Sequence, residues 1–199
     1  MIIIKDKKDS INKMKELRLN FFPLEVFDVS ALDEIKAFFD KYPAQEYVMR
    51  SPDKTNGNFF YVKDFDEAKV FLKYFNKEVT IDVSYRPYKD SIILVGDIKI
   101  HKGPFEDIVD ITARTDSEAT QRNIYHAPEY NMHTTLDDNK LWDIPGFSKI
   151  ARYISDHELY DVIVEFGVYD CKIGVNRENV VITELRTAYW KKLVIWYYF

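Results

Sequence analysis

Apolar residues recur along this chain with the period of a helix in some stretches and of a strand in others. After Ser30 and again after Asp64, large apolar side chains follow a capping box at helical spacing, which predicts two amphipathic helices with fixed N-termini. The segment Ile144–His157 has the same spacing. Ser10 is expected to cap a short first helix that ends near Leu17.

The other apolar stretches are short and rich in β-branched and aromatic residues, so they predict strands. They cover residues 2–5, 24–29, 46–50, 59–62, 79–85, 92–100, 161–169 and 180–185. Residues 101–112 and 125–145 are predicted to be irregular, with a short helix near 119–124. Helices that alternate with strands, followed by long antiparallel pairs, indicate an α+β chain with two lobes and a cleft between them. We expect the lobes to be residues 1–85 and 86–199.

Composition narrows the class of protein. The 199 residues can bury a core without a structural metal, and with Cys171 as the single cysteine no disulfide forms within the chain. The net charge of −5 disfavours a nucleic-acid partner. No apolar run approaches the roughly 20 residues that cross a bilayer, and the first apolar residues are too few for a signal peptide. We therefore expect a cytoplasmic protein with no membrane partner.

Several short motifs follow one another in a fixed order. Glu46-Tyr-Val-Met-Arg50-Ser51 precedes a loop that contains glycine, and Asp64-Phe-Asp-Glu67-Ala68 opens the next helix. Tyr160-Asp-Val-Ile-Val-Glu165-Phe166 and Val180-Val-Ile-Thr-Glu184-Leu-Arg186 come later, on two predicted strands of one hairpin. In this order the motifs resemble those of ATP-grasp domains, over about residues 17–187. The resemblance implies an ATP-grasp-like fold with mainly antiparallel sheets.

Within the ATP-grasp class, the chain most resembles the nucleotide-binding domain of phosphoenolpyruvate synthase and pyruvate phosphate dikinase. The likeness depends on Arg50-Ser51, Glu165-Phe166 and Glu184-Leu-Arg186. Two positions depart from the pattern. Arg50 stands where most ATP-grasp enzymes have lysine, and Glu184 stands where this branch has glutamine.

The resemblance implies that ATP and Mg²⁺ are the cofactors. Mg²⁺ prefers oxygen ligands and takes one or two carboxylates, a role that falls to Glu165 and Glu184. Arg50 and Arg186 would act in catalysis, because guanidinium groups bind phosphate oxygens. Further nucleotide contacts are expected from Arg50 itself and from Lys63, Gly57 and Asn58.

Each of these residues also has a simpler interpretation. Two glutamates on a hairpin can face water, and Arg50 can form a surface ion pair. Arg186 lies two residues after Glu184 on a strand, so it can pair with that carboxylate instead of a phosphate. Lys63 can be a solvated lysine, and Gly57 with Asn58 can form an ordinary hairpin turn.

Three functions are consistent with the sequence. The first is an ATP-dependent ligase or phosphotransferase whose partners are a nucleotide and an unknown small-molecule or protein acceptor. The second is a degenerate, non-catalytic relative that binds without chemistry. The third is an aromatic-rich interaction module, since the apolar ending Leu193–Phe199 is typical of a contact surface and could join copies into a homo-oligomer.

Overall fold

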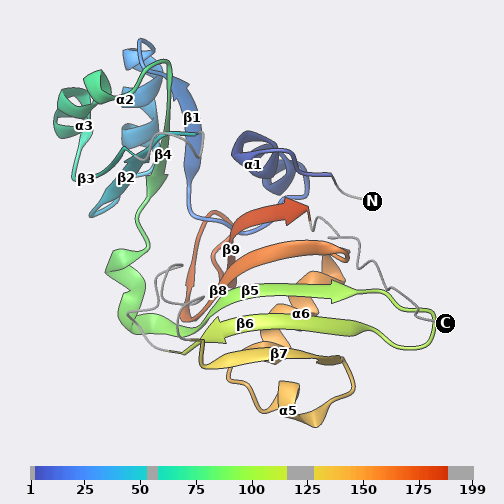
Figure 1. The fold of residues 1–199 in the computed structure, drawn as a ribbon. Helices are drawn as coiled ribbons and strands as arrows, with labels where there is room; N and C mark the ends of the chain where they lie inside the picture. Colours follow the sequence, from blue (N-terminus) through green and yellow to red (C-terminus); the bar gives the residue numbers. More distant parts are fainter. Residues whose placement is uncertain (1–2, 53–57, 116–127, 188–199) are drawn as a thin grey trace.

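Two antiparallel sheets, one in each lobe, form the fold of this computed structural model, which describes residues 3–52, 58–115 and 128–187 (Figure 1). Sheet A has the order β1-β4-β2-β3, and sheet B has the order β7-β6-β5-β8-β9. The strands of sheet A are Leu24–Asp28 (β1), Tyr47–Arg50 (β2), Phe59–Val62 (β3) and Glu78–Val83 (β4). Those of sheet B are Ile92–His101 (β5), Ile108–Arg114 (β6), Tyr130–Thr135 (β7), Val162–Ile173 (β8) and Glu178–Thr187 (β9). The expected α+β architecture with mainly antiparallel sheets is confirmed.

Helices cover one face of sheet A. They are α2 (Leu32–Lys41), α3 (Phe65–Phe71) and the 3₁₀ turn η1 (Leu72–Tyr74), and their apolar sides form an aromatic-rich core with the strands (Figure 1). The predicted cap of α3 is confirmed, since the Asp64 side chain accepts a hydrogen bond from Glu67 N at 2.9 Å. The predicted Ser30 cap is wrong. Ala31 occupies the cap position, while the Ser30 hydroxyl donates to Asp28 at 2.6 Å.

Sheet B has one apolar face, and its opposite face carries charged residues together with Tyr169, Ile173 and Val181, which belong to the core of sheet A. Helix α6 (Phe147–Asp156) lies across the apolar face, and the short helix α5 (Asn139–Trp142) precedes it (Figure 1). Alternate residues of β5, such as Leu94 and Ile98, are fully or almost fully buried in this core. Because side chains alternate along a strand, Asp97 lies on the opposite face.

The N-terminal helix α1 (Lys7–Glu16) packs against β9, the edge strand of sheet B. Its cap is Asp6 rather than the predicted Ser10. Ser10 is buried instead, and its hydroxyl accepts a hydrogen bond from Leu185 N at 2.8 Å. The strand predicted at the start of the chain is also wrong, since residues 3–5 have no regular structure.

Two segments that were predicted to be irregular form strands. Strand β6 begins at Ile108, inside the segment 101–112, and continues to Arg114. Strand β7 and helix α5 both lie within residues 125–145. Strand β6 contains no continuous apolar run, because polar side chains on its outward face alternate with the buried apolar ones. Strands β4 and β5 follow one another in the chain but belong to different sheets, and the 3₁₀ turn η2 (Arg86–Ser91) joins them.

Three predictions concern residues outside the described ranges, namely the loop that contains Gly57, the short helix near 119–124 and the aromatic C-terminus. Within the described ranges, no helix has the length and apolar character needed to span a membrane.

Candidate functional site

Three carboxylates form a row across neighbouring strands of sheet B. The register pairs Asp97 of β5 with Glu165 of β8, and Glu165 with Glu184 of β9. Strands in a sheet lie about 4.8 Å apart, so these side chains are immediate neighbours on the charged face. We call Asp97, Glu165 and Glu184 the carboxylate row.

A β-bulge aligns the row. The register of β8 with β9 shifts between Glu165 and Phe166, whose partners are Glu184 and Ile182, so Thr183 is an extra residue in β9. Ile182 and Leu185 consequently both reach the apolar core although they are three positions apart. Regular alternation from Ile182 would send Glu184 into that core. The bulge directs it instead to the face that carries Glu165.

Two cations pair with the three acids of the row. The Arg186 guanidinium lies 2.6 Å from a Glu165 oxygen and 2.9 Å from an Asp97 oxygen, so it bridges two of the acids. Lys7, at the start of α1, places its Nζ 3.3 Å from Glu184 Oε2. All the groups of this network are at least partly shielded from water, and Glu165 is only 6% exposed.

The electrostatics of the row reflect burial and crowded negative charge. Burial raises the pKa of Glu165 to about 7, and repulsion from Glu184 adds to the rise more than Arg186 counteracts it. The pKa of Asp97 is also raised, mainly by burial. The carboxylates in turn hold the pKa of Arg186 above its ordinary value, against the effect of its own burial.

Sheet A contributes a second charged pair. Arg50 at the end of β2 forms an ion pair with Asp82 of β4, whose register partner on β2 is Val48. Burial raises the pKa of Asp82, while the positive charges of Arg50 and Lys7 oppose the rise. One oxygen of Asp82 and the Nε of Arg50 are buried and have no hydrogen-bond partner among the described residues.

Lys7 connects the two charged groups. Its ammonium pairs with Glu184 of sheet B and also interacts electrostatically with Arg50 and Asp82 of sheet A. Burial is the main reason that the pKa of Lys7 is lowered, and the charge of Arg50 adds to the effect. The candidate site is therefore one charged network, in which Lys7 links the ion pairs of sheet B with the Arg50–Asp82 pair of sheet A through its electrostatic interactions.

The structure brings together four of the seven residues that the sequence singled out. Arg50, Glu165, Glu184 and Arg186 all belong to the network. No described contact joins the others to it. Lys63 is exposed, and the Asn58 amide donates to the Tyr74 carbonyl oxygen. Gly57 lies outside the described residues.

The sequence interpretation missed three members of the network, namely Lys7, Asp82 and Asp97. The two aspartates had a detectable signal, because each is an acid whose neighbours on both sides in the strand are apolar residues or glycine, as Glu165 is. Lys7 had none, since the N-terminal segment contains many lysines and only the packing of α1 on β9 distinguishes this one.

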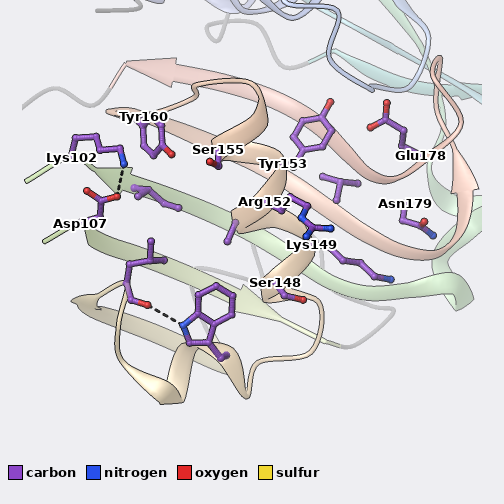
Figure 2. Close-up of a pocket in the computed structure, with 15 residues that line it drawn as sticks. Lys102, Asp107, Ser148, Lys149, Arg152, Tyr153, Ser155, Tyr160, Glu178 and Asn179 are labelled. Atoms are coloured by element: carbon purple, nitrogen blue, oxygen red, sulfur yellow. Dashed lines mark hydrogen bonds and ion pairs between the residues drawn. The ribbon is translucent and has the colours of Figure 1, made fainter.

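A broad groove lies along α6, on the apolar side of sheet B and away from the carboxylate row (Figure 2). Lys102 and Asp107 line one end and pair at 2.8 Å, while Glu178 and Asn179 lie at the other end (Figure 2). None of the residues that the sequence singled out lines this groove. It is therefore separate from the candidate site.

The residues of the network fit a magnesium ion. Over the described part of the chain, no group of three or more His, Cys, Asp and Glu side chains has the arrangement of a complete metal site. Mg²⁺ does not need one, since it commonly takes one or two carboxylates and completes its shell with phosphate oxygens and water. The buried row of acids, in which one carboxylate raises the pKa of the next, is short of positive charge where such an ion would bind.

Comparison with solved structures identifies the fold. The N5-carboxyaminoimidazole synthase of Aspergillus clavatus, solved with ADP and 5-aminoimidazole ribonucleotide, matches 92% of this chain and 44% of its own, with 11% identity and a TM-score of 0.51. The D-alanyl-alanine synthetase A of Vibrio cholerae matches 92% of this chain and 55% of its own, with 10% identity and a TM-score of 0.49. An ATP-grasp RimK domain protein of Sphaerobacter thermophilus matches 90% and 58%, with 11% identity and a TM-score of 0.47.

The chain thus has an α+β ATP-grasp fold, as the order of its sequence motifs implied. It spans about half the length of the solved structures that it matches. No protein-family model matches the sequence, and no relative is found among curated proteins.

Proposed function

We propose that this chain binds ATP with magnesium between its two sheets and acts as an ATP-dependent ligase or phosphotransferase. The observation that carries the proposal is the network of ion pairs in an ATP-grasp fold, with the carboxylate row on sheet B and the Arg50–Asp82 pair on sheet A. Phosphoryl transfer from ATP depends mainly on positioning and on neutralising charge, and this network supplies both acids and cations.

Each residue of the network has a role in this proposal. Glu165 and Glu184 would hold Mg²⁺, which would neutralise phosphate charge when bound. Arg186 keeps Glu165 oriented through its ion pair, and its guanidinium would bind phosphate oxygens. Arg50, on the opposite sheet, would contact the phosphates from the other side, with Asp82 holding the guanidinium in place. Lys63, Gly57 and Asn58 are further proposed nucleotide contacts, supported by the order of the sequence motifs.

The proposal also includes the group of ATP-grasp proteins to which this chain is related. The pairs Arg50-Ser51 and Glu165-Phe166, with Glu184-Leu-Arg186, support a relationship to the nucleotide-binding domain of phosphoenolpyruvate synthase and pyruvate phosphate dikinase. The solved structure from Aspergillus clavatus is instead named an N5-carboxyaminoimidazole synthase. The acceptor is accordingly left open between small molecules and proteins, and the reaction between ligation and phosphoryl transfer.

A second candidate is a nucleotide-binding protein without turnover. The observation that favours it is the saturation of the network, in which Lys7, Arg50 and Arg186 each pair with a carboxylate of the chain itself. Cations that are held in this way contribute less to a phosphate than cations that face open solvent, because the existing pairs must rearrange. Binding without product formation would identify this second function.

The test is a thermal melt of three proteins with and without Mg-ATP. They are the wild type, the double variant Glu165→Gln/Glu184→Gln, and Glu178→Gln as a control that changes a carboxylate of β9 outside the network. Ligand at about 100 times its Kd stabilises the native state by about 2.7 kcal/mol, which raises the midpoint by roughly 5–10 °C for a chain of this size. We expect that rise in the wild type and in Glu178→Gln, and its loss in the double variant.

The outcomes separate the candidates. A midpoint rise with ADP formation upon addition of acceptor compounds supports the enzyme, and a rise without turnover over a broad acceptor screen supports the non-catalytic binder. If no nucleotide shifts the wild-type midpoint, the proposal is wrong.

A further inference from the structure

The N-terminal helix contributes a buried cation to the candidate site. Helix α1 lies beside β9, the edge strand of sheet B (Figure 1). Lys7 is the first residue of α1, and its side chain reaches Glu184 on the charged face of that sheet. The side chain is only 13% exposed, although lysine seldom loses so much contact with water. Lys8, the next residue, is 57% exposed and pairs with Glu78 at 3.2 Å.

The charges around Lys7 come from both sheets. Its Nζ lies 3.3 Å from Glu184, one of the two proposed magnesium ligands, and it interacts with Arg50 and Asp82 of the opposite sheet. The buried Lys7 ammonium has three rotatable donors, and its 3.3 Å contact to Glu184 is longer than a strong charge-assisted bond of about 2.7–2.9 Å. The contact with Glu184 therefore uses only part of the hydrogen-bonding capacity of the Lys7 ammonium.

We propose that Lys7 is a phosphate-binding residue of the nucleotide site, acting from α1 together with Arg50 and Arg186 from the two sheets. This inference rests on the proposed function and adds to it a residue from outside the two sheets. The fixed position of α1 supports a phosphate-binding role for Lys7. The Ser10 hydroxyl accepts a hydrogen bond from Leu185 N at 2.8 Å, and the Asp6 side chain caps the helix. These contacts fix the position of Lys7 relative to Glu184.

Three variants test the role of the charge. Lys7→Met removes it and keeps the length of the side chain, Lys7→Arg keeps it, and Lys8→Met is the matched control on the same turn of α1. Calorimetry would measure the affinity of each protein for Mg-ATP, Mg-ADP and adenosine. We expect Lys7→Met to weaken ATP and ADP binding about 10- to 100-fold, the effect of one charge-assisted hydrogen bond, and to leave adenosine binding unchanged. Lys7→Arg should retain most of the affinity, and Lys8→Met all of it.

A measurement on the wild type covers the case in which Lys7→Met does not fold. Limited acetylation with acetic anhydride, followed by mass spectrometry of peptides, would report the reactivity of Lys7 and Lys8 in one sample. Mg-ATP should slow the modification of Lys7 and leave that of Lys8 unchanged. Equal rates at Lys7 with and without a saturating nucleotide would contradict the proposal.

The outcomes distinguish this inference from the function on which it rests. If the wild type binds Mg-ATP and Lys7→Met binds it equally well, the role of Lys7 is wrong while the proposed function stands. A loss that is as large for adenosine as for ATP would also overturn it, because it would show an effect on the fold rather than on phosphate. If the wild type binds no nucleotide, both the function and the role of Lys7 are wrong.

Discussion

Glu165 and Glu184 lie directly opposite each other on β8 and β9, and they do so because Thr183 is an extra residue in the ladder. Bulges of this kind redirect a side chain and frequently occur beside functional sites. Here the bulge takes a carboxylate away from an apolar core and places it beside two others. An arrangement that brings acids together at the expense of regular pairing is expected for a binding site rather than for a structural element.

The crowding of acids predicts that Glu165→Gln stabilises the nucleotide-free protein. Glu165 is buried, its pKa is raised to about 7, and repulsion from Glu184 contributes to that rise. Glutamine removes the charge and can still accept a hydrogen bond from Arg186. We expect the free energy of unfolding in urea, measured without divalent ions, to increase by about 1–3 kcal/mol.

The same substitution should abolish the response to Mg-ATP, so stability and binding should change in opposite directions. Glu178→Gln, on the same strand but outside the network, should change neither property. A Glu165→Gln protein that unfolds more easily than the wild type would mean that the ion pair with Arg186 outweighs burial and repulsion.

The pair formed by Arg50 and Asp82 should show a strong energetic coupling. Asp82 is buried and its pKa is raised, so removal of Arg50 leaves a shielded carboxylate with one fewer partner. Because the Arg50 side chain is 31% exposed, we expect Arg50→Met to cost about 1–3 kcal/mol, less than a fully buried pair would. A double-mutant cycle with Asp82→Asn should give a coupling of about 1–2 kcal/mol.

The exposed pair Lys36–Asp40 on α2 is the matched control for that cycle. Its partners are an i,i+4 pair whose side chains are 56% and 66% exposed, so its coupling should be much smaller than that of Arg50 and Asp82. Equal couplings for the two pairs would show that the Arg50–Asp82 pair contributes no more than an ordinary surface contact.

The hairpin of β8 and β9 could be predicted from the sequence because its apolar stretches are long. Charged residues inside such stretches, as at Glu165 and Glu184, stood out for the same reason. The alternation of β6 and β7 was harder to detect, since polar outward positions such as Asp110 and Asn131 interrupt the apolar ones. A search for continuous apolar runs cannot find strands of which one face is polar.

The complete network could not be predicted, because its members come together only through packing between distant segments. Lys7 and Glu184 are 177 positions apart in the chain, and Arg50 and Asp82 are 32 apart. Local periodicity can indicate which face of a strand a residue occupies, but it contains no information on which sheet that face meets. Because α1 packs on β9, the Lys7 side chain pairs with Glu184 in the site, whereas Lys8 pairs with Glu78 outside it.

Gly174 is predicted to tolerate no side chain. It lies in the turn between β8 and β9 with φ +80°, and a Cβ there would meet the Asn20 side-chain oxygen at 2.4 Å. Asn20 is fully buried and donates to the carbonyl oxygens of Ile173 and Val180, at 2.9 and 2.7 Å, so it cannot move aside without losing these bonds. Gly174→Ala should therefore cost about 2–4 kcal/mol, measured by urea unfolding.

Lys172→Ala is the control for the Gly174 substitution, because Lys172 is an exposed residue of the same hairpin. Its free energy of unfolding should stay within about 0.5 kcal/mol of the wild type. A Gly174→Ala protein as stable as Lys172→Ala would mean that the turn adopts another backbone conformation.

The buried Tyr153 hydroxyl should make the free energy of unfolding decrease at alkaline pH. Its hydroxyl oxygen accepts a hydrogen bond from Asn20 N at 2.5 Å, and burial raises the pKa of Tyr153 to about 12 from an ordinary value of 10.0. Below pH 10 the hydroxyl is neutral in both states. Between pH 10 and 12 it ionises mainly in the unfolded state, so the free energy of unfolding falls as the pH rises, by roughly 2–3 kcal/mol.

Tyr153→Phe should be about 1–3 kcal/mol less stable than the wild type at pH 8, because Asn20 N then lacks an acceptor. This deficit should shrink or reverse at pH 11.5 in urea unfolding, since phenylalanine cannot ionise while effects of the other tyrosines are common to both proteins. A deficit that stays constant from pH 8 to pH 11.5 would show that Tyr153 ionises equally well in the folded and unfolded chains.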